Sequence, residues 1–276
     1  MNANFTSRII PQPTRILLAV LLLSHSVIKP VPHDQPADSL SVDKIMKGYK
    51  AAFVMLDNSD GKYFRYNKKR CAERYLPAST FKIPNSLIGL ESGVIADENF
   101  IIKWDGIKRW NKDWNRDNTL ASAIKISSVP YYQELARRVG REAYGRYFKS
   151  FNYGNNVIGD KVEEFWLDNS LKISADEQLS FLKQFYEYKL PFSKRNTDIV
   201  KKILSKEKHP RSIMKFKTGT GETDNGKYIG WLVGYVEKEN NVFFFAFNVE
   251  AETFEEVRNI RDTASRKILI TLKILE

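Results

Sequence analysis

The spacing of apolar residues changes twice along the chain, and each change predicts a different kind of element. The apolar stretches 54–56 and 63–66 flank the polar segment 58–61, which predicts two strands joined by a tight turn. After residue 209 the apolar residues again form short runs bounded by turn residues. These runs predict three more strands, at 214–217, 228–235 and 242–247. We therefore expect a sheet built from strands near both ends of the chain.

Between these strands the apolar residues recur every three to four positions, which is the period of a helix. The segment 79–92 shows this spacing and is followed by Gly93, a residue typical of helix ends. Ser174 and Glu177 have the spacing of a capping box, which marks a helix start. Further helices are predicted at 118–126, 131–139, 174–188, 196–205 and 254–274. Strands on both sides of a helical region at about 79–205 predict an α+β fold.

Residues 1–26 have the three parts of a secretory signal peptide. Arg8 and Arg15 precede the apolar run 16–23, and small residues follow it. The run is shorter than the roughly 20 residues of a membrane span, so we expect cleavage, with an uncleaved anchor helix as the alternative. Residues 27–48, which contain three prolines, are expected to be a linker that leads to the folded domain. No later stretch is apolar enough to cross a bilayer, so no stable membrane span is expected.

The composition excludes several kinds of chemistry. Cys71 is the only cysteine, so neither an intrachain disulfide nor a cysteine-based zinc site can form. Of the three histidines only His209 lies beyond the N-terminal region, which argues against a histidine-rich site, and no metal is expected. A Ser-His-Asp or Cys-His hydrolase would have to use His209. The base of any nucleophilic reaction is therefore expected to be Lys, Glu or Tyr.

The chain is strongly basic, with a formal net charge of +11 and a pI of about 9.5. This excess favours anionic partners, such as a membrane surface, a cell-wall polymer or a carboxylated small molecule, although it can also serve solubility alone. Basic residues are interspersed with acidic ones, and no basic tract with stacking aromatic residues is present. Nucleic acid is therefore not expected as a partner.

Ser79 and Lys82 open the first predicted helix, directly after a turn that contains Pro77. Residues at this spacing lie on one helix face, and the free N–H groups of a helix start can hold an oxyanion. An ordinary lysine pKa of ~10.4 keeps the amine protonated, so Lys82 can act as a base only if its pKa is lowered or the amine is modified. The Ser-x-x-Lys spacing occurs eight times, but only this copy follows a proline turn and begins an apolar helix bounded by glycine.

Four other short motifs are candidates for chemistry. Lys217-Thr218-Gly219-Thr220 occurs once, at the end of an apolar strand, where a lysine beside a hydroxyl can hold a carboxylate and the glycine lets a substrate lie close. The others are Ser127-Ser128-Val129, the loop Tyr153-Gly154-Asn155, and Trp166 within the run Phe165-Trp166-Leu167. Taken alone, each of these is at least as often a turn or part of a core as a site.

Taken in order, Ser-x-x-Lys, Ser-x-Val, Tyr-Gly-Asn, Phe-Trp-Leu and Lys-Thr-Gly resemble the motifs of the class D, or oxacillinase-type, serine β-lactamases. The segments 77–90 and 132–140 are also similar to that family, and the resemblance extends from about residue 50 to the C-terminus. It implies a single catalytic domain over 49–276, with a mixed, mainly antiparallel sheet flanked by helices. It also implies a β-lactam hydrolase that is exported to the bacterial periplasm and gives resistance to penicillin-type antibiotics.

The resemblance implies a role for each catalytic residue. Ser79 would attack the β-lactam carbonyl and form an acyl-enzyme, with the oxyanion held by the backbone N–H groups of Ser79 and Thr220. Lys82 would take up carbon dioxide, supplied by bicarbonate, and this N-carboxylated lysine would be the general base for both acylation and deacylation. Val129 would keep water away from the carbamate, and the Trp166 indole N–H would donate to it. No other cofactor is expected.

Other residues are expected to bind the substrate or to move a proton. Ser127, beside Lys217, would pass a proton to the leaving nitrogen of the β-lactam. The expected substrate-binding residues are Lys217, Thr218, Gly219, Thr220 and Arg261. Arg261 is chosen by its spacing on the last helix, and Arg258 is the alternative for this arginine. The loop Tyr153-Gly154-Asn155 is expected to have a structural role.

Two other functions share part of this motif set. A penicillin-binding peptidase or transpeptidase has Ser-x-x-Lys and Lys-Thr-Gly and releases its acyl group slowly, but the Tyr-Gly-Asn and Phe-Trp-Leu matches argue against it. A β-lactam sensor domain stays acylated and signals, but known sensors have several membrane spans and a protease region, which are not found here. A degenerate, inactive relative is a third alternative. The expected partners are small-molecule β-lactams, together with a second copy of the chain in a homodimer.

Overall fold

The computed structural model describes Met1 and residues 39–276, so the expected signal peptide and most of the expected linker lie outside the described residues. Residues 39–276 belong to one compact unit. Among the described residues, no helix combines the length and the apolar character that a membrane crossing requires.

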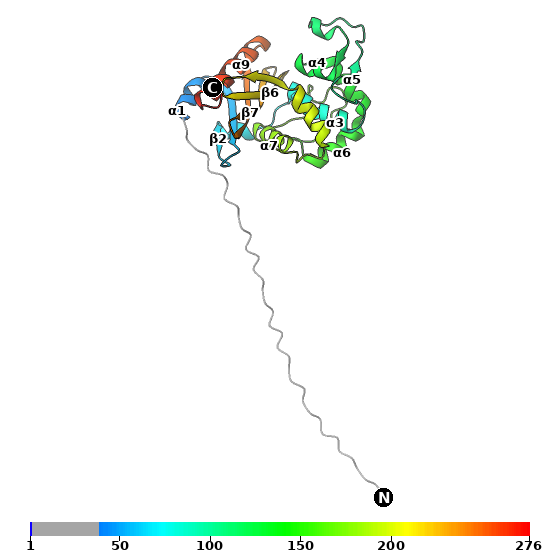
Figure 1. Ribbon diagram of the computed structural model, residues 1–276. Coiled ribbons are helices and arrows are strands. Elements are labelled where there is room, and N and C mark those ends of the chain that lie inside the picture. Colours follow the sequence, from blue (N-terminus) through cyan, green and yellow to red (C-terminus); the bar gives the residue numbers. More distant parts are fainter. Residues whose placement is uncertain (2–38) are drawn as a thin grey trace. The chain divides into compact units, whose positions relative to one another are not determined.

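A six-stranded sheet forms the centre of this unit (Figure 1). Its strands are β1 (Lys50–Asp57), β2 (Tyr63–Tyr66), β5 (Ser205–Lys208), β6 (Ser212–Glu222), β7 (Tyr228–Lys238) and β8 (Asn241–Ala251). They follow the order β2-β1-β8-β7-β6-β5, and every neighbouring pair is antiparallel. The N-terminal strand β1 therefore pairs with the C-terminal strand β8, which confirms the predicted α+β sheet made from both ends of the chain.

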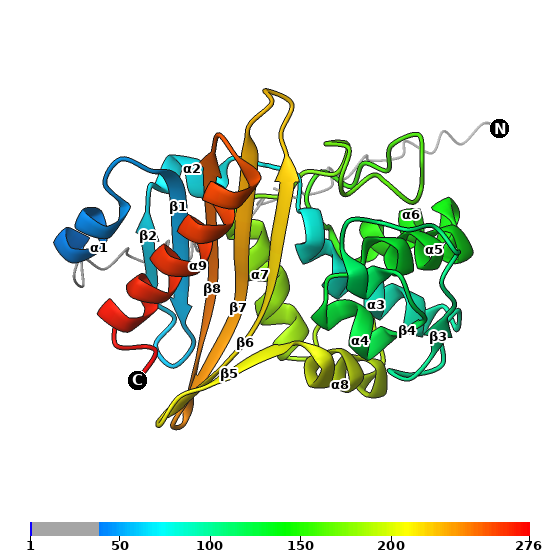
Figure 2. The same cartoon turned by 90° about the horizontal axis from the view of Figure 1, so that it is seen from above.

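Helices cover both faces of the sheet. The helices are α1 (Ser39–Met46), α2 (Lys68–Ala72), α3 (Lys82–Glu91), α4 (Leu120–Lys125), α5 (Val129–Val139), α6 (Arg141–Phe151), α7 (Ala175–Tyr186), α8 (Lys194–Ile203) and α9 (Phe254–Thr271). Two short 3₁₀ helices, η1 (Ala78–Phe81) and η2 (Lys112–Trp114), and a small ribbon of β3 (Ile101–Ile102) and β4 (Asn118–Thr119) complete the described elements. In Figure 2, α1 and α9 lie on one face of the sheet, and α7 with the helical region lies on the other.

The central strands are buried on both faces. Apolar side chains of β7 and β8, including Trp231, Leu232 and Phe247, are completely shielded from solvent. One face packs against Val257 and Ile268 of α9, and the other packs against α7 and the helical region. This two-sided burial explains why these strands are continuous apolar runs and do not alternate between apolar and polar residues.

Several elements differ from the sequence prediction. The expected helix 79–92 begins as the 3₁₀ helix η1 and continues as α3, and Ala78 at its start has a left-handed φ of 47°. Helix α1 occupies part of the segment expected to be a linker, and it is held by Val42 and Met46, which are buried with α9. The elements not predicted are α1, α2, α6, β3, β4 and β5, and the predicted strand 214–217 is the centre of the longer β6.

Cys71 lies in α2, is fully buried and is not part of a disulfide. Its sulfur is 3.3 Å from the Tyr66 carbonyl oxygen and 3.5 Å from the Phe53 carbonyl oxygen. The thiol therefore fills a space between α2 and the first hairpin.

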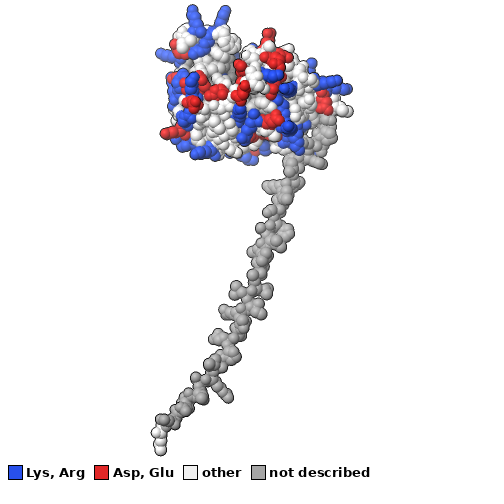
Figure 3. Space-filling model, turned by 180° about the vertical axis from the view of Figure 1, so that it is seen from behind, with Lys and Arg blue, Asp and Glu red and all other residues white. Residues whose placement is uncertain are grey.

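Charged side chains of both signs are interspersed on the face shown in Figure 3. Ion pairs such as Arg65–Asp176 and Arg266–Glu207 join opposite charges in the described part of the chain. The positive net charge is thus spread among acidic residues on this face, in agreement with the mixed pattern along the sequence.

Candidate active site

The turn 76–82 places Ser79 at the edge of a cavity. Trp231 Nε1 donates to the first carbonyl of this turn at 2.9 Å. The Ala78 N–H donates to the Trp166 carbonyl at 3.1 Å. Ser79 follows directly on the left-handed Ala78, is half-buried, and lines the cavity. The serine hydroxyl is therefore presented to solvent-accessible space by a turn that is tied to a strand and to a loop.

Lys82 lies one helical turn beyond Ser79, and its amine is 2.7 Å from the Ser79 hydroxyl oxygen. The lysine side chain is fully buried. Burial, followed by the positive charge of Lys217, holds the pKa of Lys82 well below its ordinary value. A neutral amine at this distance can accept the serine proton, which would make Ser79 a nucleophile.

Aromatic side chains enclose this lysine. The Lys82 amine lies 5.3 Å from the centre of the Tyr132 ring, and the adjacent Phe81 stacks on Trp166 with ring centres 5.4 Å apart. Trp166 is fully buried, and its indole N–H has no hydrogen-bond partner among the described residues. An unpaired buried donor is costly, so this N–H favours an acceptor in its vicinity.

A second polar pair consists of Ser127 and Lys217. The Lys217 amine donates to the Ser127 hydroxyl at 3.1 Å and to the Thr218 carbonyl at 2.9 Å. Lys217 is only 2% exposed, and burial together with the nearby charge of Arg261 lowers its pKa to about 7. Ser127 has a φ of 55° in the short link between α4 and α5, and this conformation belongs to the backbone that brings its hydroxyl to Lys217.

Arg261 joins α9 to the end of β6. Its guanidinium donates to the Thr220 hydroxyl at 2.9 Å and, through other nitrogens, to the Asp262 carboxylate at 2.8 Å. Arg258 also lines the cavity, but its guanidinium lies over the Phe254 ring, 5.4 Å from the ring centre. Of the two arginines, Arg261 is thus the one with a side-chain hydrogen bond to the Lys-Thr-Gly-Thr segment.

The cavity has a volume of about 510 Å³. Its polar lining includes the predicted residues Ser79, Ser127, Thr218, Gly219, Thr220 and Arg261. Val129 and Leu167 provide an apolar part of the wall. The structure therefore brings these residues, from five segments that are distant in the sequence, to one concave surface, which is the arrangement of a small-molecule site.

Three aromatic residues at this cavity were not predicted from the sequence. Trp110 and Trp114 have ring centres 5.2 Å apart, and Trp110 also approaches Phe254 from the start of α9, at 6.4 Å. Trp110 is 73% exposed. An exposed tryptophan in a loop has no periodic pattern around it, so only the folded arrangement identifies it as part of the cavity rim.

The Tyr153-Gly154-Asn155 segment does not line the cavity, and its contacts hold the loop at residues 170–172. Gly154 has a φ of 60°, and a Cβ there would be 2.2 Å from the Lys172 carbonyl oxygen. Asn155 accepts from the Lys172 N–H at 2.9 Å and donates to the Ser170 carbonyl at 2.8 Å. Tyr153 is buried beside Thr80 and Gln178. These contacts give the segment a structural part in the site.

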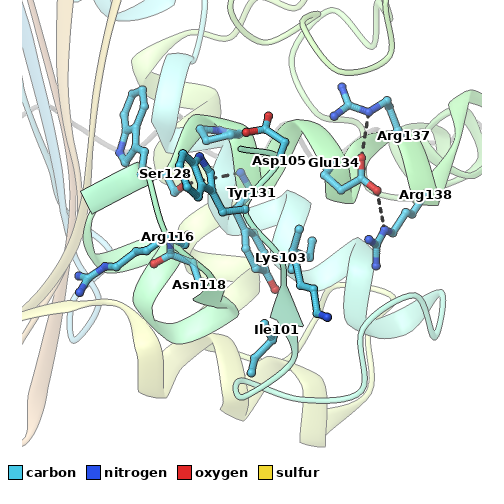
Figure 4. Close-up of a pocket in the computed structure, with 14 residues that line it drawn as sticks. Ile101, Lys103, Asp105, Arg116, Asn118, Ser128, Tyr131, Glu134, Arg137 and Arg138 are labelled. Carbon is cyan, nitrogen blue, oxygen red and sulfur yellow. Dashed lines mark hydrogen bonds and ion pairs between the residues drawn. The ribbon is translucent and has the colours of Figure 1, made fainter. Parts of the chain in front are cut away.

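A second hollow, of about 350 Å³, lies between α5 and the loop that follows β3 (Figure 4). Ser79 does not line it. Two acidic residues line it: Glu134 accepts from both Arg137 and Arg138, at 3.0 and 2.8 Å, and Asp105 accepts from Arg109 at 2.8 Å. The hollow therefore contains paired charges and no nucleophile next to a base. Across residues 39–276, no group of three or more His, Cys, Asp or Glu side chains is arranged to hold a metal ion.

Comparisons with known proteins agree with this geometry. The family model for the penicillin binding protein transpeptidase domain matches residues 51–270. The β-lactamase OXA-48 of Klebsiella pneumoniae is 39% identical over 261 residues, which cover 94% of this chain and 98% of that protein. The regulatory protein BlaR1 of Bacillus licheniformis is 38% identical over 200 residues, which cover 72% of this chain but only 33% of BlaR1.

Among solved structures, the class D β-lactamase FUS-1 (OXA-85) of Fusobacterium nucleatum subsp. polymorphum superimposes with a TM-score of 0.83. The two chains are 35% identical, and the match covers 88% of this chain and all of FUS-1, at 100%. The likeness therefore includes the sheet, the helical region and the cavity between them.

Proposed function

Because this chain belongs to the class D β-lactamases, serine enzymes that hydrolyse β-lactams, we propose that Ser79 is its nucleophile and the Lys82 side chain its general base. The observation that supports this assignment most directly is the 2.7 Å contact between the Ser79 hydroxyl and a fully buried lysine whose pKa is lowered.

In the first half of the reaction, Ser79 Oγ forms a bond to the β-lactam carbonyl carbon while the Lys82 side chain takes the serine proton. The backbone N–H groups of Ser79 and Thr220 would hold the resulting oxyanion, as the family resemblance implies. The C–N bond of the ring then breaks, and the leaving nitrogen receives the proton that the Lys82 side chain took from Ser79, passed on through Ser127, whose hydroxyl is 3.1 Å from the Lys217 amine. The Lys82 side chain is then unprotonated again and can act as base in the second half. The product of this half is an acyl-enzyme on Ser79.

In the second half, a water molecule loses a proton to the Lys82 side chain and attacks the ester carbonyl. Ser79 Oγ leaves with a proton, and the opened β-lactam is released. Lys217, Thr218 and Arg261 bind the carboxylate of the substrate, which explains why positive side chains are buried at the end of β6.

Lys82 fits the expected carbon dioxide adduct in two respects. Its low pKa provides the neutral amine that reacts with carbon dioxide, and the unpaired indole N–H of Trp166 is a donor that an added carboxylate needs. When present, the carbamate supplies an anionic base near neutral pH. We propose Lys82 and Trp166 as the residues that hold it, with Val129 and Leu167 limiting access of water through the cavity wall.

The similarity to BlaR1 keeps the sensor alternative testable, since a sensor domain would form the same acyl-enzyme without releasing it. A penicillin-binding transpeptidase would also release its acyl group slowly. The three functions therefore differ in turnover and share the first covalent step.

The decisive experiment mixes the purified protein with a chromogenic cephalosporin, with and without added bicarbonate. We expect many turnovers per protein and a rate that rises with bicarbonate, whereas a single stoichiometric burst would indicate a sensor or a transpeptidase. Ser79→Ala should form no acyl-enzyme, measured as the absence of a mass increase after incubation with a penicillin. Acylation of the Ser79→Ala protein would contradict the assignment.

We further propose export to the bacterial periplasm, on the basis of the signal-peptide pattern in residues 1–26. Homodimer formation stays a prediction from the sequence.

A further inference from the structure

The turn 76–82 has a conformation that requires support from outside the turn. Ala78 has a φ of 47°, a left-handed value that residues with a Cβ rarely adopt. Ser79 is the next residue, so any relaxation of Ala78 would move the serine hydroxyl. The position of the nucleophile therefore depends on contacts that hold the residues on both sides of Ala78 and Ser79.

One polar connection holds both sides at once. The Thr80 hydroxyl donates to the Pro77 carbonyl at 2.7 Å, and Gln178 Nε2 donates to the same Thr80 hydroxyl at 2.7 Å. Pro77 precedes Ala78 and Thr80 follows Ser79, so these contacts close a loop around the nucleophile. We call this pair of hydrogen bonds the Thr80 bridge.

Gln178 reaches the Thr80 bridge from α7, a helix that contributes no residue to the cavity lining. Gln178 and Thr80 are each only 1% exposed, and the buried Tyr153 hydroxyl lies beside both side chains. Helix α7 itself packs on β1 and β8. The bridge thus connects the turn of the nucleophile to the sheet through a helix on its face.

Stability alone does not explain a glutamine at this position. An apolar side chain of similar size could fill the same space in the core, and replacing a buried polar pair by apolar groups of the same shape can leave stability nearly unchanged. The polar pair instead fixes the orientation of the Thr80 hydroxyl group. Because the hydroxyl oxygen accepts from Gln178 Nε2, the O–H hydrogen is directed to the Pro77 carbonyl.

On its other side, the turn 76–82 packs closely against strand β6. A Cβ on Gly219 would be 2.9 Å from the Pro77 oxygen and 3.2 Å from the Thr80 nitrogen, so the strand fits the turn closely. The turn is therefore held between β6 and the Thr80 bridge, with Ser79 facing the cavity.

We propose that Gln178 is a positioning residue for acylation, which acts through Thr80 to keep the Ser79 hydroxyl 2.7 Å from the Lys82 amine. This inference depends on the proposed function, because it requires Ser79 to be the nucleophile.

The test measures the rate constant of acylation and the dissociation constant of a chromogenic cephalosporin by stopped flow, for the full-length protein and for Gln178→Leu. We expect acylation to slow by about 10- to 100-fold, since small displacements of a reacting group have effects of this size, with a nearly unchanged dissociation constant. The midpoint of the pH profile of acylation should stay in place, because the surroundings of the Lys82 amine are not altered.

Gln184→Leu provides the matched control, with the same substitution on the same helix at a partly exposed position that lies outside the bridge. It should acylate like the parent protein. If Gln178→Leu lowers the melting temperature but acylates at the parent rate at 25 °C, Gln178 has only a structural role and the proposal is wrong.

A second pair of variants serves if Gln178→Leu does not fold. Thr80→Ser keeps the bridging hydroxyl and should retain most of the acylation rate, while Thr80→Val removes it and should slow acylation as Gln178→Leu would. Equal rates for the two Thr80 variants would overturn the proposal. Failure of the parent protein to acylate would instead contradict the proposed function, so the two failures are distinguishable.

Discussion

Lys82 and Lys217 are close enough to influence each other in this site, and neither has a carboxylate partner among the residues that the structure describes. Lys82 is fully buried and Lys217 is 2% exposed, and the charge of Lys217 contributes to the lowered pKa of Lys82. Arg261 in turn lowers the pKa of Lys217. Burial and the neighbouring cations leave the Lys82 amine neutral, and therefore able to react, while Arg261 keeps positive charge available for an anionic substrate.

The unpaired Trp166 indole N–H leads to a prediction at the residue scale. Trp166→Phe keeps an aromatic ring against Phe81 and removes the donor, so the bicarbonate concentration that half-restores activity after carbon dioxide is removed should rise about 10-fold or more. Bicarbonate titrations of turnover check this value. Trp104→Phe, whose indole N–H donates to the Ile107 carbonyl outside the catalytic cavity, should titrate like the parent protein. An unchanged titration for Trp166→Phe would show that the indole does not hold the carbamate.

Lys217 leads to a pH prediction. Its pKa of about 7 in the free protein means that its positive charge is lost as the pH rises through 7. Binding of a substrate carboxylate should then weaken, so kcat/KM should fall between about pH 7 and 9 while kcat changes less, since kcat/KM reports on the free enzyme. Steady-state kinetics of a penicillin across this range provide the measurement. A flat kcat/KM profile would exclude titration of Lys217 as a determinant of binding.

The ordered motifs point to the proposed catalytic residues, whereas no motif points to the residues that support them. Ser79, Lys82 and Lys217 belong to short strings whose order along the chain is distinctive. Gln178 belongs to no such string, and its partner Thr80 lies 98 positions away. A hydrogen bond of this kind exists only after the helix and the turn have packed together, so residue spacing provides no signal for it.

At the scale of elements, β6 has two functions at the same residues. Its Lys-Thr-Gly-Thr end lines the cavity, and Gly219 packs against the turn 76–82. The sequence suggested that this glycine makes room for a substrate. The structure shows that the nearest atoms to a Cβ at this position belong to the turn itself, at Pro77 and Thr80.

Gly219→Ala should therefore disturb the chemistry through the backbone. The added Cβ would lie 2.9 Å from the Pro77 oxygen, closer than real contacts allow, so β6 or the turn must shift. We expect acylation to slow by about 10- to 100-fold while the protein stays folded, as measured by stopped flow and circular dichroism. Gly145→Ala in α6, where a Cβ meets no atom within 4 Å, is the control and should acylate normally. Parent-like acylation by Gly219→Ala would mean that the contact is not needed.

Predicted elements were most accurate where the apolar period was long and continuous. The runs that became β7 and β8 were found because they are buried along most of their length, and the closing helix α9 was found because its buried residues recur every three to four positions. Helix α6 was not predicted, although Tyr144 and Phe148 anchor it in the core, because Gly140 and Gly145 interrupt its pattern with helix-breaking residues. At such elements the local sequence pattern argues against a helix, but packing against the core stabilises the helix, and the helix forms.

At the scale of the whole molecule, the buried Lys82 amine should lower stability. Because its folded-state pKa lies well below its unfolded value, the unfolded protein binds more protons, and the cost of burying this amine is present at pH 7 and diminishes as the pH rises toward the unfolded pKa of ~10.4. Lys82→Met should therefore be inactive but more stable by about 1–2 kcal/mol at pH 7 in buffer free of carbon dioxide.

Denaturant unfolding of both proteins at pH 7 and pH 10 tests this prediction. The difference should be larger at pH 7 than at pH 10, and bicarbonate should stabilise the parent protein but not Lys82→Met. A Lys82→Met protein that is less stable than the parent at pH 7 without bicarbonate would contradict the argument.

The arrangement of the chain places this site where distant segments meet. Pairing of β1 with β8 lets the helical region leave the sheet after β2 and return at β5, so its turn 76–82 and its α4–α5 link face the end of β6. The family model spans residues 51–270, so it includes the strands of the sheet from both ends of the chain.

The solitary thiol of Cys71, enclosed between α2 and the first hairpin, has a practical consequence. Alkylating reagents can reach it only in molecules whose α2 has separated from the hairpin, so the kinetics of modification measure how often that separation occurs. The wild-type chain thus contains a chemical reporter of local opening, at a single known position and without any engineered label.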